Sequence, residues 1–254
     1  MPYQQLDAEK IVATVDKLHR RIVERFPNAG LANVCEKLLE IAQAARERSE
    51  WIARPIVWVR LVSGVLILTV LASAVLTGWV ILSGTRAQQS ISSAELIQAV
   101  EAAVNDVVII GASIFFFATL ESRIKRRRAL GAIHELRSIA HIIDMHQLTK
   151  DPERLLSKGA DTKSSPVRTM TQFELSRYLD YCSEALSLTG KVAALYVQKF
   201  EDSAAVAAVN DVESLTTDMA RKVWQKLMVL HAGDGASGGN HETAAVAAPV
   251  ERPA

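Results

Sequence analysis

The sequence predicts an all-α fold, in which a two-span transmembrane helical hairpin is joined to cytoplasmic amphipathic helices that form a bundle. Residues 61–85 carry no charged side chain, and a second apolar run follows at 107–120. Outside these runs the chain is rich in Ala, Leu, Glu, Lys, Arg and Gln, which favour helices. No stretch alternates apolar and polar residues between turn residues, as the strands of a β-hairpin do. We therefore expect helices throughout, two of them inside a membrane.

Residues 1–54 are predicted to form a cytoplasmic N-terminal helical hairpin. Residues 6–26 and 31–53 place apolar side chains at helical spacing on one face, and residues 27–30 (Pro-Asn-Ala-Gly) separate the two segments. Helices joined by so short a link pack as antiparallel neighbours. The apolar positions are Ile11, Val15, Leu18, Ile22 and Phe26 in the first segment and Leu31, Val34, Leu38, Ala42 and Ala45 in the second.

Residues 55–128 are predicted to form the transmembrane hairpin. The first span, about 61–85, has 25 residues. At about 1.5 Å per residue it is long enough to cross a hydrocarbon core of roughly 30 Å with some tilt. Trp58 and Trp79 lie 21 residues apart, or roughly 31 Å along a helix, which suits the two interfacial belts where Trp is enriched.

The second span is predicted at about 102–120. Its apolar run is short by itself, but Ser92 and Glu95 have the spacing of a capping box, so the helix is expected to begin near Ser93 and to enter the membrane already formed. Asp106 then lies near the outer end of the span. A dense group of basic residues follows the span and ends it.

Basic residues next to the spans predict the orientation. The connection, residues 86–101, holds a single basic residue, Arg86. Basic residues favour the cytoplasmic side, so we expect an external connection and two cytoplasmic termini, in a multi-pass protein of the cell inner membrane. The other flanking basic residues are Arg46, Arg48, Arg54 and Arg60 before the first span and Arg123, Lys125, Arg126, Arg127, Arg128 and Arg137 after the second.

Residues 129–231 are predicted to form a cytoplasmic helical bundle that contains a linker at 158–170. Helical character continues from the second span to about Leu148, and Asp151 followed by Pro152 predicts a short helix that ends near Ser157. Residues 232–254 lack large apolar side chains other than Val and are predicted to be a disordered tail.

Two long helices are expected between the linker and the tail. Thr171 and Glu174 form a capping box at the start of the first, and Asp202 or Ser203 caps the second. The short connection makes the two helices antiparallel neighbours. Their apolar faces contain Leu175, Leu179, Cys182, Leu186, Val192 or Ala193, Tyr196 and Phe200, and then Val206, Val209, Val212, Met219, Val223, Leu227 and Leu230.

Polar residues form a narrow stripe on each predicted span. One interpretation is close helix packing with interhelical hydrogen bonds, within the hairpin or between protomers. The other is an oligomeric pore lined by the stripes, with Asp106 forming a ring at its mouth. Packing is favoured, because a carboxylate near the interface costs little. The stripes contain Thr69, Ser73 and Thr77 on the first span and Asn105, Asp106, Ser113 and Thr119 on the second.

The basic group after the second span is interpreted as a topology determinant that contacts anionic lipid. Nucleic-acid binding would need positive charge spread over a wider face, whereas the flanking chain is close to balanced and the net charge is +1. We therefore expect no nucleic acid among the partners. The group contains Arg123, Lys125, Arg126, Arg127 and Arg128.

Four residues near the end of the helix at 129–148 suggest a metal or proton-relay site only weakly. His141 and Asp144 lie three residues apart and can share an ion, whereas His134 is about 10 Å from His141 along the helix and His146 points to another face. The favoured interpretation is that all four are polar helix positions satisfied by their neighbours. We expect no cofactor.

No catalytic pattern accompanies these residues. The sequence has neither a nucleophile elbow nor a phosphate-binding or dinucleotide-binding loop. Cys35 and Cys182 both fall in predicted cytoplasmic helices, where thiols stay reduced, and Cys182 lies on an apolar face. We therefore expect a protein that is not an enzyme.

These features favour a membrane-anchored helical interaction or scaffold protein that associates with itself or with a cytoplasmic protein partner. The alternative is an oligomeric, channel-like protein that its cytoplasmic helices gate. The order of amphipathic helices, two spans and further helices is similar to the layout of the two-transmembrane effector domains of bacterial conflict systems, without a shared motif. Two spans by themselves enclose no conduit, so the alternative requires self-association.

Overall fold

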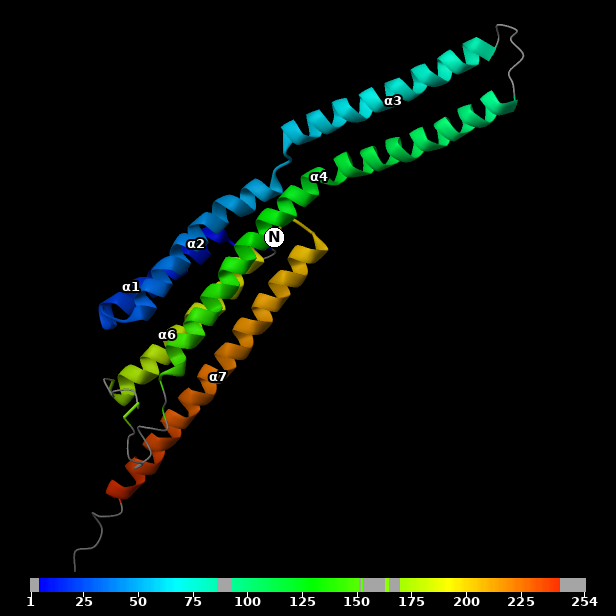
Figure 1. Ribbon diagram of the computed structural model, residues 1–254. Coiled ribbons are helices and arrows are strands. Elements are labelled where there is room, and N and C mark those ends of the chain that lie inside the picture. Colours follow the sequence, from blue (N-terminus) through cyan, green and yellow to red (C-terminus); the bar gives the residue numbers. More distant parts are fainter. Residues whose placement is uncertain (1–4, 86–92, 151, 153–162, 165–169, 243–254) are drawn as a thin grey trace, which may run out of the picture. The chain divides into compact units, whose positions relative to one another are not determined.

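The computed structural model describes residues 5–85, 93–150, 152, 163–164 and 170–242. Every regular element in these residues is an α-helix, and the described part of the chain contains no strand. The predicted all-α class is therefore confirmed. The helices labelled in Figure 1 are α1 (Ala8–Arg25), α2 (Gly30–Ala53), α3 (Val57–Thr85), α4 (Ser93–Leu148), α6 (Gln172–Ala194) and α7 (Ser203–Glu242).

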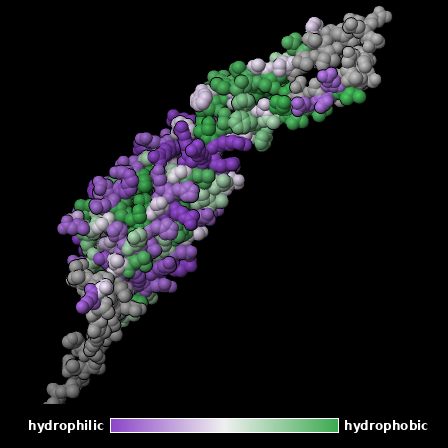
Figure 2. Space-filling model, viewed as in Figure 1, coloured by the Kyte–Doolittle hydropathy of each residue, from purple (hydrophilic) through white to green (hydrophobic). Residues whose placement is uncertain are grey.

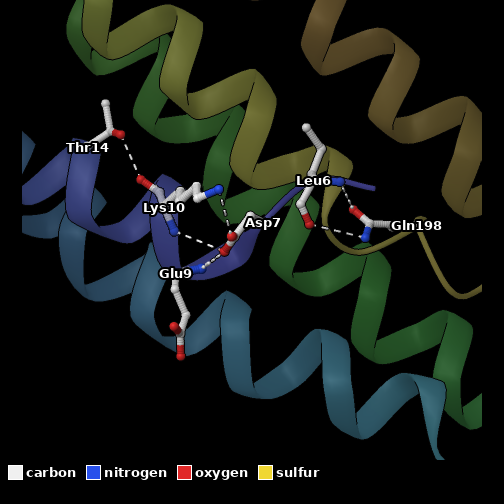
Figure 3. Close-up of polar contacts among 6 residues, drawn as sticks. All are labelled: Leu6, Asp7, Glu9, Lys10, Thr14 and Gln198. Atoms are coloured by element: carbon white, nitrogen blue, oxygen red, sulfur yellow. Dashed lines mark hydrogen bonds and ion pairs between the residues drawn. The ribbon is translucent and has the colours of Figure 1, made fainter. Parts of the chain in front are cut away.

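Side-chain caps begin two of these helices. Asp7 precedes α1, and its carboxylate accepts hydrogen bonds from the backbone N–H groups of Glu9 (3.0 Å) and Lys10 (3.2 Å), as Figure 3 shows. α6 has the predicted capping box, in which Thr171 Oγ1 accepts from the Glu174 N–H and the Glu174 carboxylate accepts from the Thr171 N–H. These bonds satisfy donors that the first turn of a helix leaves without an intrahelical partner.

Two more contacts position the ends of helices. Asp202 caps α7, because its carboxylate accepts from the N–H groups of Ala204 and Ala205, both at 3.1 Å. Before α1, the Leu6 N–H donates to Gln198 Oε1 (3.0 Å) and Gln198 Nε2 donates back to the Leu6 carbonyl (3.2 Å; Figure 3). This pair of bonds joins the start of α1 to the segment between α6 and α7.

The chain folds as two compact units. Unit 1 comprises the described residues of Met1–Trp51 and Ala129–Ala254, and unit 2 comprises those of Ile52–Arg128. The predicted N-terminal hairpin and the predicted C-terminal helices thus lie in one unit. α4 contributes its first part to unit 2 and its last part to unit 1.

In unit 1, α6 and α7 pack along an extensive interface. The backbones approach closely at Gly190, where an added Cβ would lie 3.2 Å from Thr216 Oγ1. The sequence predicted Val206 on the apolar face of α7, but its side chain is 37% exposed. Ala205 lies on the buried face instead. The buried face of α6 and the following turn contains Leu175, Leu179, Cys182, Leu186, Val192, Ala193 and Tyr196, and that of α7 contains Val209, Val212, Met219, Val223, Leu227 and Leu230.

α1 packs against α6 through aromatic and charged contacts. The buried ring of Phe26, which follows α1, meets the rings of Tyr178 and Tyr181 edge-on, with centroid distances of 5.5 Å and 6.2 Å. Arg21 and Glu184 form a bidentate pair with N–O distances of 2.7 Å and 3.2 Å. The apolar face of α1 therefore reaches α6, a helix that lies far away in the sequence.

The last part of α4 is also held in unit 1 by polar contacts. Arg48 of α2 pairs with Glu135 of α4 at 3.5 Å. The Lys226 ammonium of α7 donates to the backbone carbonyls of Gln147 (2.7 Å) and Lys150 (3.2 Å). A cation suits this position, because the last carbonyls of a helix have no intrahelical donor.

Unit 2 leaves most of its described large apolar side chains exposed, although Ile52, Ile56 and Val59 are buried. Figure 2 shows hydrophobic residues over much of its visible surface, whereas the visible surface of unit 1 is largely hydrophilic. Two helical stretches, within Gly30–Ser73 and Val107–Leu148, are long and apolar enough to cross a membrane, as judged by length and composition alone. Only 11% and 0% of their most apolar windows are buried inside the protein. A core helix of similar composition would be mostly buried.

The C-terminal segment differs from its prediction. α7 continues to Glu242, so residues 232–242 of the predicted disordered tail are helical. Extending a helix adds one hydrogen bond per residue, whereas nucleating a new helix is unfavourable, and α7 is already formed at this point. Several predicted features lie wholly or mostly outside the described residues, namely the tail at 243–254, the connection at 86–92 with Ser92 of its capping box, the short helix at 152–157 and the linker at 158–170.

Candidate functional site

The predicted polar stripes of α3 and α4 bond mainly to their own helices. Four of their hydroxyls donate to backbone carbonyls three or four residues earlier, at 2.7–2.9 Å. Such bonds satisfy the hydroxyl donor of Ser or Thr within its own helix. Asn105 is exposed, and the side chains of Thr77 and Asp106 are not among those described. The four hydroxyls belong to Thr69, Ser73, Ser113 and Thr119.

A polar cluster in unit 2 surrounds Glu121, which directly follows the predicted second span. Its Oε2 accepts from Arg60 Nε at 2.6 Å, and its Oε1 lies 2.9 Å from Lys125 Nζ and accepts from the Ile56 N–H at 3.2 Å. The side chains of Glu121 and Lys125 are only 14% and 10% exposed, whereas that of Arg60 is 64% exposed. We call these four residues the Glu121 cluster.

The cluster stabilises the charged carboxylate. The Arg60 hydrogen bond lowers the pKa of Glu121 most, burial opposes it, and Lys125 and the Ile56 N–H lower it further, so that the pKa falls from 4.5 to about 2. Glu121 is therefore ionised at neutral pH. Because Ile56 and Arg60 stand at the start of α3, the cluster fastens this end of α3 to α4 and satisfies one N–H group there.

Sequence reasoning missed Glu121 and gave Lys125 another role. The basic pattern predicts that Lys125 contacts lipid, whereas its side chain is buried and its ammonium lies against the half-buried Glu121 carboxylate. The available signal is the Glu–Lys spacing of four residues, which places both side chains on one helix face. Arg123 lies over the Phe116 ring, 5.7 Å from its centroid. The remaining members of the basic group, Arg126, Arg127 and Arg128, have exposed side chains.

The histidines of α4 do not converge on a metal site. His134 and His141 are exposed, and the Asp144 carboxylate accepts from Gln147 Nε2 at 2.6 Å. His146 is half-buried. Within the part of the chain that the structure describes, no group of three His, Cys, Asp or Glu residues is placed to hold a metal ion.

Both cysteines lie in the core of unit 1. Cys35 and Cys182 are buried free thiols, and burial raises the pKa of each to about 12. A thiol with so high a pKa carries almost no thiolate at neutral pH and is a poor nucleophile. Neither cysteine therefore supports a catalytic role.

Unit 1 exposes two groups of large apolar side chains. On α7, Trp224 and Met228 lie one turn apart and are 62% and 53% exposed; we call them the α7 apolar pair. On the last turns of α4, Ile142, Met145 and Leu148 are exposed at a spacing of three residues. Trp and Met are enriched in protein interfaces relative to other surfaces.

No family model matches the chain, and neither a curated protein nor a solved structure shows significant similarity to it.

Proposed function

We propose that this protein is a membrane-anchored, non-enzymatic helical interaction protein that associates with copies of itself. In this proposal α3 and the first part of α4 cross the bilayer as an antiparallel hairpin, and unit 1 presents the binding surface. The observation that carries the proposal is the exposure of the apolar windows in helices long enough to span a membrane. Their apolar area needs a lipid environment, because water solvates it poorly.

The Glu121 cluster supports a boundary between membrane and water at this end of unit 2. Arg60 directly precedes the first uncharged stretch, and Glu121 directly follows the second. Charged side chains are costly inside the hydrocarbon core, so the paired Arg60, Glu121 and Lys125 suit a position at its edge. The exposed Arg126, Arg127 and Arg128 then favour the cytoplasmic side, with both termini there, in a cell inner membrane.

The α7 apolar pair supports the interaction part of the proposal. A Trp that is 62% exposed beside a Met that is 53% exposed leaves apolar area that a second copy of the chain can cover. Large aromatic residues supply much of the binding energy in protein interfaces. The non-enzymatic part of the proposal rests on the sequence, which carries no nucleophile elbow and no phosphate-binding or dinucleotide-binding loop.

The test of self-association compares the full-length protein with the double variant Trp224→Glu/Met228→Glu in detergent micelles. We expect the wild-type protein to form at least a dimer. The variant is expected to lose about 2 kcal/mol of association free energy, which raises the dissociation constant roughly thirtyfold. Size-exclusion chromatography with light scattering gives the protein mass in the micelle as the protein is diluted.

A matched control carries the same change in charge on the same helix. The double variant Ser214→Glu/Gln225→Glu alters two exposed positions of α7 outside the apolar pair and is expected to associate like the wild type. A wild-type protein that is monomeric at every concentration contradicts self-association. Equal weakening by both variants means that general charge repulsion, rather than the α7 apolar pair, controls association.

The pore alternative receives no support from the described hydroxyls, which donate within their own helices. A pore requires ion flux that depends on the stripe residues, so its test is leakage from liposomes. Flux that Ser73→Leu or Asp106→Ala abolishes without loss of insertion would favour the pore over the anchored interaction protein.

A further inference from the structure

Unit 1 contains a cavity of about 450 Å³ where the turn between α1 and α2, the last turn of α4 and the beginning of α6 meet. A volume of this size falls within the range of small-molecule sites and is much larger than one water molecule. The wall contains apolar and aromatic side chains as well as polar and basic ones. The side chains that matter for its chemistry are Arg25, Phe26, His146, Lys150, Met170 and Tyr178.

The charged groups in the wall are cationic. Among the residues that the structure describes, no Asp or Glu lines the cavity. Each cation instead lies over an aromatic ring, with Arg25 Cζ 5.3 Å from the Phe173 centroid and Lys150 Nζ 5.3 Å from the Tyr178 centroid. In the part of its wall that the structure describes, the cavity therefore combines two cations and no carboxylate.

The acid that acts electrostatically on Arg25 is engaged elsewhere. The Glu174 carboxylate accepts from the Thr171 N–H at 2.8 Å and from the Thr171 hydroxyl at 3.0 Å, in the capping box of α6. Because these bonds begin α6, the carboxylate is not available to neutralise the cavity. An anion that enters the cavity would supply the negative charge that the described part of its wall lacks.

His146 completes the polar side of the wall. Its ring lies directly over Gly30, where an added Cβ would collide with His146 Cε1. Burial, with a contribution from Lys150, lowers the pKa of His146, so the imidazole is neutral at pH 7 and offers one donor and one acceptor. The absence of a side chain at Gly30 thus allows a hydrogen-bonding ring to pack in the cavity wall, where Lys150 acts on it electrostatically.

We propose that this cavity binds the phosphate group of a small phosphorylated molecule. The Arg25 guanidinium matches phosphate oxygens with two donors, and Lys150 adds a compact charge. His146 donates a third hydrogen bond, and Phe26 and Met170 contact the organic part of the ligand. The group that the cavity recognises is a phosphate ester or a diphosphate. It belongs either to a soluble metabolite or to a lipid headgroup.

The test uses full-length protein in phosphatidylcholine nanodiscs, titrated calorimetrically with pyrophosphate and with ADP. We expect saturable binding of at least one probe. The double variant Arg25→Gln/Lys150→Gln should weaken it by roughly tenfold or more, because each cation contributes a charge-assisted hydrogen bond. A second set of nanodiscs contains phosphatidic acid, whose headgroup competes with the soluble probes if it occupies the cavity. Loss of probe binding in this set alone identifies the lipid headgroup as the ligand.

The control is Lys17→Gln/Arg137→Gln, which removes the same charge from exposed positions of α1 and α4 outside the cavity. This control should bind like the wild type. Gly30→Ala, which displaces the His146 ring without changing charge, should also weaken binding, and circular dichroism checks that each variant is folded. The proposal is overturned if the wild type shows no saturable binding of either probe, or if the control weakens binding as much as the cavity variant.

Discussion

At the scale of single residues, Glu121 shows how one carboxylate can organise a basic segment. The residues from Arg123 to Arg128 suggest a uniformly solvated or lipid-bound face, yet Lys125 is buried against Glu121. A buried ammonium without a partner is costly, so the carboxylate four residues earlier decides where this side chain lies. The same carboxylate holds Arg60 and the Ile56 N–H, which connects the start of α3 to α4.

The Glu121 cluster predicts a defined dependence of stability on pH. The folded-state pKa of Glu121, about 2, lies below the ordinary value of 4.5. A lowered acid pKa means that the stabilisation is complete above pH 4.5 and is lost as the pH falls toward 2. Glu121→Gln should reduce the free energy of unfolding by about 2 kcal/mol at pH 7 and should flatten its change between pH 4.5 and pH 2.

Denaturant titration in detergent, followed by circular dichroism, measures both effects. Glu101→Gln provides the matched control, because Glu101 is an exposed acid on the same helix. Its substitution should change the free energy of unfolding little. If Glu121→Gln behaves like Glu101→Gln at pH 7, the cluster does not stabilise the fold.

At the scale of elements, the pairing of α6 and α7 shows how a small residue sets the distance between two helices. Gly190 is buried where α6 and α7 approach closely, with Thr216 and Glu213 opposite it. Gly131 is also inside a helix, yet an added Cβ there meets no atom within 4 Å. The two glycines therefore separate the effect of helix packing from the effect of intrinsic helix propensity.

Gly190→Leu is predicted to destabilise unit 1 by about 1–3 kcal/mol, because the added side chain overpacks the α6–α7 interface. Gly131→Leu is predicted to leave stability unchanged or to raise it by up to about 1 kcal/mol, since glycine is a poor helix former. Thermal unfolding in detergent compares the two variants with the wild type. Equal destabilisation by both would mean that α6 and α7 do not require the close approach at Gly190.

At the scale of the whole molecule, burial separates two kinds of helix. The helices of unit 1 bury one face each, as amphipathic sequences do, and the apolar windows in α3 and α4 bury almost none of their surface. Length and hydropathy by themselves do not distinguish a membrane span from the core helix of a soluble protein. The low buried fraction of the two apolar windows is the feature that favours a membrane span over the core helix of a soluble protein.

The proposed membrane anchor predicts that the protein stays with its membrane and leaves that membrane tight. Reconstituted in liposomes, the full-length chain should remain in the pellet after washing at pH 11, because the spans are held by apolar contact with lipid. A dye trapped inside the same vesicles should leak no faster than from vesicles without protein. Release of the protein into the supernatant would contradict the anchor, and leakage that depends on Ser73 would favour the pore.

The sequence by itself determined the features that depend on local hydrogen bonding and hydropathy. It predicted the all-α class, the capping box of Thr171 and Glu174 and the two apolar stretches, and the structure agrees with each. It also predicted a cap at Asp202 or Ser203, and the structure shows the cap at Asp202. Each of these features depends on residues within a few positions of one another.

Only the tertiary structure decided which residues meet across the chain. It brought Arg60 to Glu121, α1 to α6, and Arg25, His146, Lys150 and Tyr178 to one cavity. The chain around each of these residues contains no signal for its partner, since helical periodicity gives the direction of a side chain and not the helix that it faces. Packing many apolar faces at once selects those neighbours, and the polar contacts follow from that selection.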